Sequence, residues 1–209
     1  MPPDFPSARE PVTFAGGVLD PYRHVCAFVD APWQDPVFDP FISDGVDRGD
    51  RLLYLVDPAA PAAPVNRLRH LGYDAGDLLG HHRAEVRTWA ETYLKGGRFD
   101  QARMLDVLDE VLVEQPSPRI RMLCDMGWAA ERPELADDLI EFEAKANFIH
   151  ARHDHVVICS YEATKFDGAF IVDILRTHPM VLIGGMLQEN PFFIPPSEFL
   201  EERDARAAS

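Results

Sequence analysis

Short, predominantly apolar runs that recur between helix-like segments are the feature that most restricts how this chain can fold. Three of them are 24–30 (HVCAFVD), 52–56 (LLYLV) and 120–126 (IRMLCDM). A strand with one face in water alternates apolar and polar residues, whereas a strand of a helix-covered parallel sheet is apolar on both faces. Together with shorter runs at 156–159 and 181–183, they predict a three-layer α/β fold with a mostly parallel sheet flanked by helices.

The segments between these runs have apolar residues at helical spacing. Leu135, Leu139 and Phe142 recur every three or four positions, and Pro133 suits the first turn of their helix. The predicted helices are 37–48, 65–71, a helix starting after Asp100, a helix from 133 to 149, 167–176 and 197–203, with a partly alternating segment at 82–89. We predict an irregular N-terminal arm (1–22), one domain (23–203) and a C-terminal tail (204–209).

Composition and charge restrict the partners and the compartment. The chain has 209 residues, 46% hydrophobic and 26% charged, as in ordinary globular domains. With 20 Lys+Arg against 35 Asp+Glu, its net charge of −15 disfavours direct nucleic-acid binding and favours a basic protein partner. No run is long enough to cross a membrane, and the N-terminus does not resemble a signal peptide. We therefore expect a cytoplasmic protein whose three cysteines are reduced and buried.

The first strand–loop–helix–strand unit resembles that of P-loop ATPases of the RecA/KaiC type. Such a loop needs glycines and a lysine to hold phosphate groups. Residues 31–36 contain neither glycine nor lysine, and they include two prolines, which have no N–H to donate. We therefore predict a degenerate phosphate loop without ATP hydrolysis. Asp125 stands where such ATPases bind magnesium, but we expect it to cap the following turn.

Catalytic and metal-binding patterns are weak. The chain has no GxSxG, HExxH or paired CxxC motif, and the histidines of HARHDH (150–155) are expected to be solvated at a helix end. His24 and Cys26 share one face of a strand, and with Cys159 and His178 nearby they could form a zinc-type cluster. A buried thiol and a hydrogen-bonded histidine explain the same residues, so we predict no catalytic residue, metal or cofactor.

Seven segments in order resemble the MEDS family of sensory domains, and together they cover about residues 22–203. The segments are HVCAFV (24–29), PFISDGVDRGDRLLYLV (40–56), YLKGGRFD (93–100), RIRMLCDMGWA (119–129), EFEAKANFI (141–149), VVICSYEATKFDGAFIVDILRTHP (156–179) and NPFFIPPSEFL (190–200). The resemblance implies a sensory domain related in fold to the P-loop ATPases, with the nucleotide site lost. It also implies a small organic ligand. Because the similarity uses nearly the whole chain, we expect the signal to pass to a separate partner, such as a kinase, an anti-sigma factor or a transcription regulator.

Eight residues, all of them in these segments, are the predicted ligand-binding residues. Open α/β sheets bind ligands at the carboxyl ends of their strands, and Glu143 and Asn147 share one helix face. The predicted site consists of His24, Cys26, Trp128, Glu143, Asn147, Cys159, Tyr161 and His178.

Two alternatives remain open at this level. One is a protein-interaction module whose former ligand site is packed shut. The other is a metal-dependent enzyme that uses His24, Cys26 or Asp125. A cavity lined by Trp128, Tyr161 and His178 would favour the sensor, whereas solid packing of these three side chains would favour the interaction module.

Overall fold

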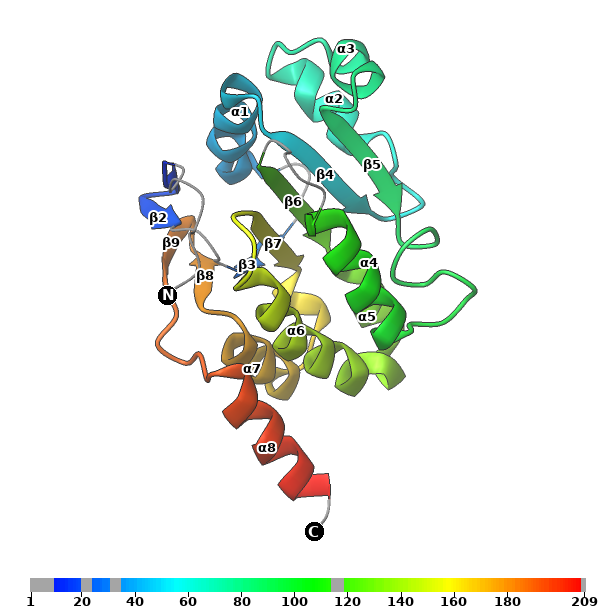
Figure 1. Cartoon of the computed structure of the whole chain (residues 1–209), viewed down its shortest axis with the longest axis vertical. Coiled ribbons are helices and arrows are strands. Elements are labelled where there is room, and N and C mark those ends of the chain that lie inside the picture. Colours follow the sequence, from blue (N-terminus) through cyan, green and yellow to red (C-terminus); the bar gives the residue numbers. More distant parts are fainter. Residues whose placement is uncertain (1–9, 20–23, 31–34, 114–118, 208–209) are drawn as a thin grey trace, which may run out of the picture.

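A sheet through the middle of the molecule contains seven of the strands that the structure describes (Figure 1). The structure is a computed structural model, and it describes residues 10–19, 24–30, 35–113 and 119–207. The strand order across the sheet is β5–β4–β6–β7–β3–β8–β9, and every neighbouring pair is parallel except β8–β9. The strands are β3 (His24–Phe28), β4 (Arg51–Val56), β5 (Ala84–Thr88), β6 (Ile120–Asp125), β7 (Val156–Tyr161), β8 (Met180–Ile183) and β9 (Met186–Glu189).

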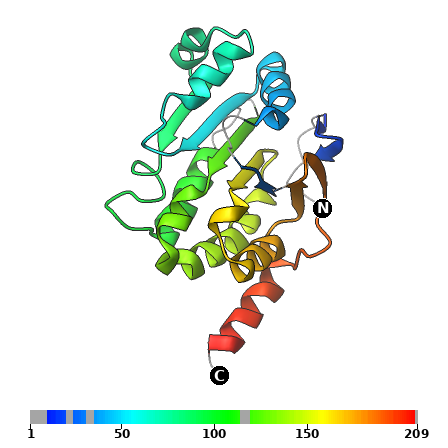
Figure 2. The same ribbon diagram turned by 180° about the vertical axis from the view of Figure 1, so that it is seen from behind.

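Helices cover both faces of this sheet and enclose two separate apolar cores, so the predicted three-layer α/β fold is confirmed (Figures 1 and 2). One face carries α4 (Gln101–Val113), α5 (Gly127–Glu131), α6 (Ala136–His150), α7 (Gly168–Thr177) and α8 (Pro196–Ala207). The other face carries α1 (Asp39–Arg48), α2 (Ala63–His70) and α3 (Ala75–Gly80). Short 3-10 turns occur at Pro36–Phe38, Pro133–Leu135 and Ala163–Lys165.

Part of the expected irregular arm is a β-hairpin. Strands β1 (Val12–Phe14) and β2 (Gly17–Leu19) pair antiparallel around Ala15 and Gly16, whose φ angles are 48° and 75°. Positive φ at both central residues is typical of the turn that matches strand twist in tight hairpins. The hairpin buries Val12, Phe14 and Leu19 in the same core as α1. Three-residue strands are too short to produce a recognisable apolar pattern, which is why the sequence did not indicate them.

Several local predictions are confirmed by side-chain contacts. Asp100 accepts a hydrogen bond from the Arg103 amide at 3.1 Å and caps α4, and Asp167 caps α7 through the Phe170 amide. Asp125 Oδ1 accepts from the Gly127 amide at 2.9 Å, so it caps the turn after β6 as expected. Helix α3 and strand β9 were not predicted, because each is short and partly exposed.

Helix α6 determines where polar groups are buried. It packs against α4, α7 and α8 as well as the sheet-side core, so neighbouring elements cover more than one of its faces. A helix covered in this way is expected to be apolar all round. The burial of Glu143, Asn147 and His150 within α6 is therefore an exception that needs an explanation.

None of the helices in the described ranges combines the length and the apolar character that a membrane crossing needs.

Candidate functional site between α6 and the sheet

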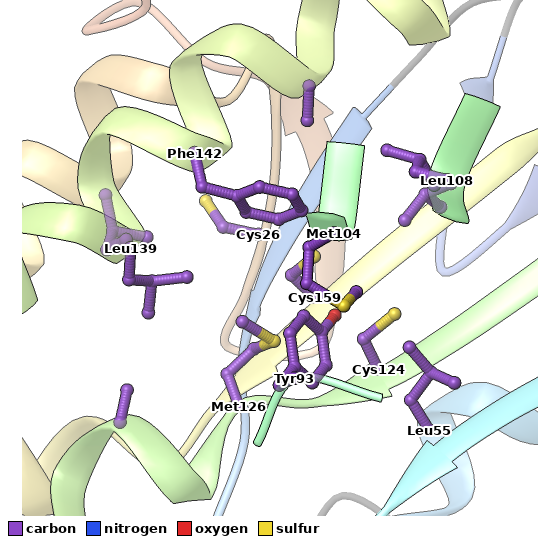
Figure 3. Packing of buried hydrophobic residues seen from close by; sticks show 14 of the residues in the cluster. Cys26, Leu55, Tyr93, Met104, Leu108, Cys124, Met126, Leu139, Phe142 and Cys159 are labelled. Carbon is purple, nitrogen blue, oxygen red and sulfur yellow. The ribbon is translucent and has the colours of Figure 1, made fainter. Parts of the chain in front are cut away.

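Three cysteines form a row across three adjacent strands beneath α6. Cys124 of β6 is in register with Cys159 of β7, and Cys159 is in register with Cys26 of β3. Residues in register on parallel strands point to the same face of a sheet. All three thiols are free and buried, as predicted, and Figure 3 shows them in the apolar core, with Cys26 drawn next to Phe142 of α6 and Cys159 near Met104.

Four fully buried side chains meet beside this row, and we refer to them as the polar cluster: His24, Glu143, Cys159 and His178. One potential ligand atom from each residue lies within 4.8 Å of all the others. His24 Nε2 lies 3.3 Å from Cys159 Sγ and 3.3 Å from Glu143 Oε2. Glu143 Oε2 lies 3.7 Å from His178 Nε2 and 3.9 Å from Cys159 Sγ.

Four different elements supply the polar cluster. His24 is the first residue of β3, and Cys159 is the fourth residue of the neighbouring strand β7. Glu143 projects from α6, and His178 lies between the end of α7 and β8. Since β3 pairs with both β7 and β8, the strand order brings residues 135 positions apart into contact.

One carboxyl oxygen of Glu143 accepts a hydrogen bond from outside the polar cluster, and the other oxygen faces the cluster. The Tyr161 hydroxyl donates to Glu143 Oε1 at 2.8 Å, and Tyr161 is itself fully buried in an aromatic group. Its bond fixes the orientation of the carboxyl group and leaves Oε2 among the histidines and Cys159.

His178 has a fixed ring orientation and a defined tautomer. Its Nδ1 lies 2.8 Å from the carbonyl oxygen of Ile174, and a carbonyl can only accept a hydrogen bond. Nδ1 therefore carries the proton, and in the neutral ring Nε2 is left with a lone pair. Among the residues that the structure describes, Nε2 has no hydrogen-bond partner, and it lies 3.7 Å from Glu143 Oε2.

Asn147 connects the helices that carry Glu143 and His178. Its side-chain amide donates to the carbonyl oxygen of Glu143 at 2.9 Å and to that of Thr177 at 2.8 Å. It thereby ties α6 to the end of α7, immediately before His178.

The expectation that the HARHDH histidines are solvated is wrong for His150 and His155. His150, the last residue of α6, is buried with its ring centroid 4.6 Å from that of His24. His155 is also buried, since its Nδ1 accepts from the Ile120 amide at 2.8 Å and its Nε2 lies 2.9 Å from the Leu112 carbonyl oxygen. The segment passes under α4 into β7, so both rings are covered by neighbouring elements.

Burial shifts the pKa values of the ionisable groups in this site toward their neutral forms. Loss of hydration raises the pKa of Glu143 to about 7, although hydrogen bonds from Tyr161 and Cys159 lower it. Burial lowers the pKa of His178 to about 4 and, with smaller effects from neighbouring histidines, that of His150 to about 3. Burial, followed by His178 and His150, also lowers the pKa of His24 well below its usual value.

A cavity of about 30 Å³ adjoins the polar cluster. His24, Glu143 and Cys159 form one part of its wall, while apolar side chains from α4, α6 and the sheet form most of the rest. Such a volume is room for about two water-sized groups. Figure 3 shows Tyr93, Met104 and Cys159 pointing toward one another, with Cys124 and Leu55 beside them. These residues and Leu108, Met122, Phe142, Ala146, His150 and Val157 all belong to the cavity wall.

The eight predicted residues fall into three groups. His24, Glu143, Cys159 and His178 converge on one point, and Tyr161 and Asn147 hold two of them in place. Cys26 of β3 lies beside Cys159 of β7 but outside this group, and its thiol donates a weak hydrogen bond to the Met180 carbonyl oxygen at 3.7 Å. Trp128 lies elsewhere, in an aromatic group with Tyr93, Phe99 and Phe142.

The location of the cluster differs from the expected carboxyl ends of the strands. His24 begins β3 and His178 precedes β8, so these two residues lie toward the amino ends of parallel strands. Trp128, Tyr161 and His178 are not among the residues that line the cavity. The sequence also missed His150, Tyr93 and Met104, and only the apolar spacing of the predicted helix after Asp100 indicated that Met104 faces inward.

The fold and the site together define an α/β domain with a buried polar cluster and a small adjoining cavity. A model of the family described as the MEthanogen/methylotroph, DcmR Sensory domain (MEDS) matches residues 23–179. The chain therefore belongs to the MEDS family of sensory domains, as the sequence motifs indicated. No curated protein matches the chain.

Proposed function

We propose that this domain senses a small organic molecule that binds in the cavity beside the polar cluster. The observation that carries the proposal is the combination of an apolar cavity with His24, Glu143 and Cys159 on one side of it. Ligand sites are typically apolar with a few polar groups that fix orientation. The cavity volume of about 30 Å³ favours a compound of only a few non-hydrogen atoms that carries one polar group.

Binding would matter for signalling because the cavity wall comes from both α4 and α6. Met104 and Leu108 belong to α4, whereas Glu143 and Ala146 belong to α6. A ligand shifts a conformational equilibrium only when it binds two states with different affinities. A compound that contacts both helices would favour the state in which their spacing fits it.

The proposal is tested with a cavity-filling variant and a control on the same strand. Val157→Ile adds one methyl group toward the cavity from β7. Val156→Ile makes the same chemical change at the neighbouring position, which is buried in the core of the opposite face. Ligand-detected NMR with a library of compounds of a few heavy atoms measures binding to both variants and to the unmodified chain.

We expect compounds that bind the unmodified chain to bind Val156→Ile equally and Val157→Ile at least about tenfold more weakly, since the added methyl group occupies their volume. Absence of any binding compound, or equal binding to both variants, would contradict the proposal.

One observation favours the alternative of a protein-interaction module. Trp128 and Tyr161 are fully buried and pack solidly against other aromatic rings, with Trp128 stacked on Tyr93 at a centroid distance of 5.4 Å. Neither residue lines the cavity beside the polar cluster. If the NMR screen finds no ligand, the interaction module becomes the better account.

We propose that the signal passes to a separate protein, such as a kinase, an anti-sigma factor or a transcription regulator. Membership of a sensory family supports a signalling role, and the net charge of −15 supports a basic protein surface as the partner. Affinity capture from cells with and without the bound compound tests this proposal, because a true partner is enriched in only one of the two conditions.

A further inference from the structure

We infer that the polar cluster is a binding site for one zinc-class divalent metal ion, with His24 Nε2, His178 Nε2, Cys159 Sγ and Glu143 Oε2 as its four ligands. The inference goes beyond the proposed function, although it assigns to an ion three side chains, His24, Glu143 and Cys159, that also form part of the cavity wall; the two are tested separately. It is carried by the separations between the ligand atoms, by the contacts that orient them and by their chemical types.

The separations are close to those of a tetrahedral site. Zinc lies about 2.0–2.1 Å from nitrogen or oxygen ligands and about 2.3 Å from sulfur, so tetrahedral ligands are about 3.3 Å apart for two nitrogen or oxygen atoms and about 3.6 Å apart when one of them is sulfur. Four of the six separations are 3.3 Å from His24 Nε2 to Cys159 Sγ, 3.3 Å from His24 Nε2 to Glu143 Oε2, 3.7 Å from His178 Nε2 to Glu143 Oε2 and 3.9 Å from Cys159 Sγ to Glu143 Oε2, and the other two lie within 4.8 Å. Four elements thus bring their ligand atoms close to the spacing that an ion requires.

The contacts around two of the four ligands, His178 and Glu143, orient them as metal ligands are usually oriented. A ligating histidine commonly donates its other N–H to a carbonyl, which fixes the ring and exposes the second nitrogen as a lone pair. His178 does this through Ile174, and its buried Nε2 has no hydrogen-bond partner in the described part of the chain. A ligating carboxylate is likewise hydrogen-bonded at its other oxygen, as Tyr161 does for Glu143.

The ligand types select the class of metal. Magnesium and calcium prefer oxygen ligands, whereas a thiolate combined with two imidazoles suits zinc and similar softer ions. Four protein ligands complete a tetrahedral shell and leave no position for a reacting water, which is the arrangement of a structural rather than a catalytic zinc site. The inferred ion therefore stabilises the junction of α6 with β3, β7 and the end of α7.

The test uses the full chain, depleted of metal with a chelator and then titrated with zinc or cobalt. We expect one ion per chain by elemental analysis after gel filtration and a higher unfolding temperature with zinc. Cobalt should give the intense visible bands of a tetrahedral site and a sulfur-to-metal charge-transfer band, which reports coordination by a thiolate.

Three variants identify the ligands. Cys159→Ser should lose the charge-transfer band and bind zinc at least about tenfold more weakly, because a hydroxyl is a poor substitute for a thiolate. Glu143→Gln keeps the acceptor for Tyr161, and it should weaken binding while it retains the band. Cys26→Ser is the matched control, since this thiol lies in the same row outside the cluster, and it should behave as the unmodified chain.

Folding of each variant is checked by circular dichroism, and the unmodified chain alone suffices to reject the inference if Cys159→Ser fails to fold. Folded, metal-depleted chain that takes up neither zinc nor cobalt would overturn it. Uptake of cobalt without a charge-transfer band, or stoichiometric copper in place of zinc, would also overturn it. Val157→Ile, which narrows the cavity but removes no ligand atom, should still take up one ion per chain and so separates this result from the test of ligand sensing.

Discussion

Burying Glu143 beside His24 and His178 removes hydration from three ionisable groups, so their neighbours have to compensate for its loss. Tyr161 supplies a hydrogen bond to Glu143, and Ile174 supplies one to His178. Tyr161 and Ile174 are both buried. Each of these hydrogen bonds satisfies a buried polar atom and also fixes the orientation of the Glu143 or His178 side chain. At the scale of single residues, the site therefore depends on groups that never touch its centre.

Tyr161→Phe tests this dependence. The phenyl ring keeps the aromatic packing, but Glu143 Oε1 loses its hydrogen bond. We expect the free energy of unfolding of the metal-free chain to fall by about 1–3 kcal/mol, as for other buried polar groups left unpaired. The pKa of Glu143 should rise further, because the Tyr161 bond lowers it. Urea unfolding measures the first effect and infrared titration of the carboxyl band measures the second; unchanged values for both would contradict the assigned contact.

Stability of the metal-free chain should fall in mild acid because of its buried histidines. His150 has a pKa of about 3 when folded but an ordinary value when unfolded, so below about pH 6.5 only the unfolded chain binds its proton. The stabilisation is therefore present above about pH 6.5 and is lost as the pH falls toward about 3. Between about pH 7.5 and 5.5, His150 should account for a loss of about 1 kcal/mol.

The variant His150→Phe isolates this contribution. Urea unfolding at the two pH values, with a chelator present, should show a pH dependence about 1 kcal/mol smaller than that of the unmodified chain. Glu143 acts in the opposite direction, because its raised pKa favours the fold below about pH 4.5 and this advantage is lost as the pH rises through about 7. An identical pH dependence in His150→Phe and the unmodified chain would show that His150 is not buried in its neutral form.

At the scale of elements, helix α1 packs closely on the sheet because of one glycine. A Cβ atom at Gly45 would lie 2.8 Å from Cδ of Arg121, whose side chain is fully buried. Arg121 cannot move away easily, since it donates to Asp50 and Asp44 and to the carbonyl oxygen of Phe41. Close approach, rather than an unusual φ angle, therefore requires glycine at this position.

Gly45→Ala should destabilise the chain despite the better helix propensity of alanine. Overpacking of a rigid core costs about 1–3 kcal/mol, which outweighs a propensity gain of about 1 kcal/mol. Gly80→Ala, in α3, is the matched control, because no neighbouring atom lies within 4 Å of its added Cβ. Thermal unfolding should show a lower midpoint for the first variant only, and equal midpoints would refute the close contact.

The strands and long helices could be predicted because burial on both faces produces recognisable apolar runs and helical spacing. The shared face of Glu143 and Asn147 followed from their separation along one helix. The sequence alone could not show that Glu143 lies next to His24 and His178, because this contact depends on strand order and register. Nor could the burial of His150 and His155, since a polar segment at a helix end is usually exposed.

At the scale of the whole molecule, the sheet separates two cores, and the polar cluster belongs only to the one beneath α6. The other core contains α1 and the N-terminal hairpin. In P-loop proteins the phosphate-binding loop joins a strand to the following helix, as the β3–α1 connection does here. Residues 31–36 contain neither glycine nor lysine, and residues 31–34 lie outside the described ranges.

Magnesium-ATP should therefore leave the unfolding temperature unchanged, because the connection lacks the groups that bind a triphosphate. A thermal-shift measurement with zinc on the metal-depleted chain serves as the positive control for the method. Stabilisation by ATP that saturates with concentration would show that the connection binds nucleotide after all.

The central position of α6 has a mechanical consequence. This helix carries Glu143 toward the sheet and also packs against α8, the C-terminal helix that projects from the body of the domain in Figure 1. A displacement of α6 at the buried carboxyl group would therefore reach α8 directly, through the contact between the two helices. A partner protein bound to α8 would then detect a change at the buried site without contacting that site.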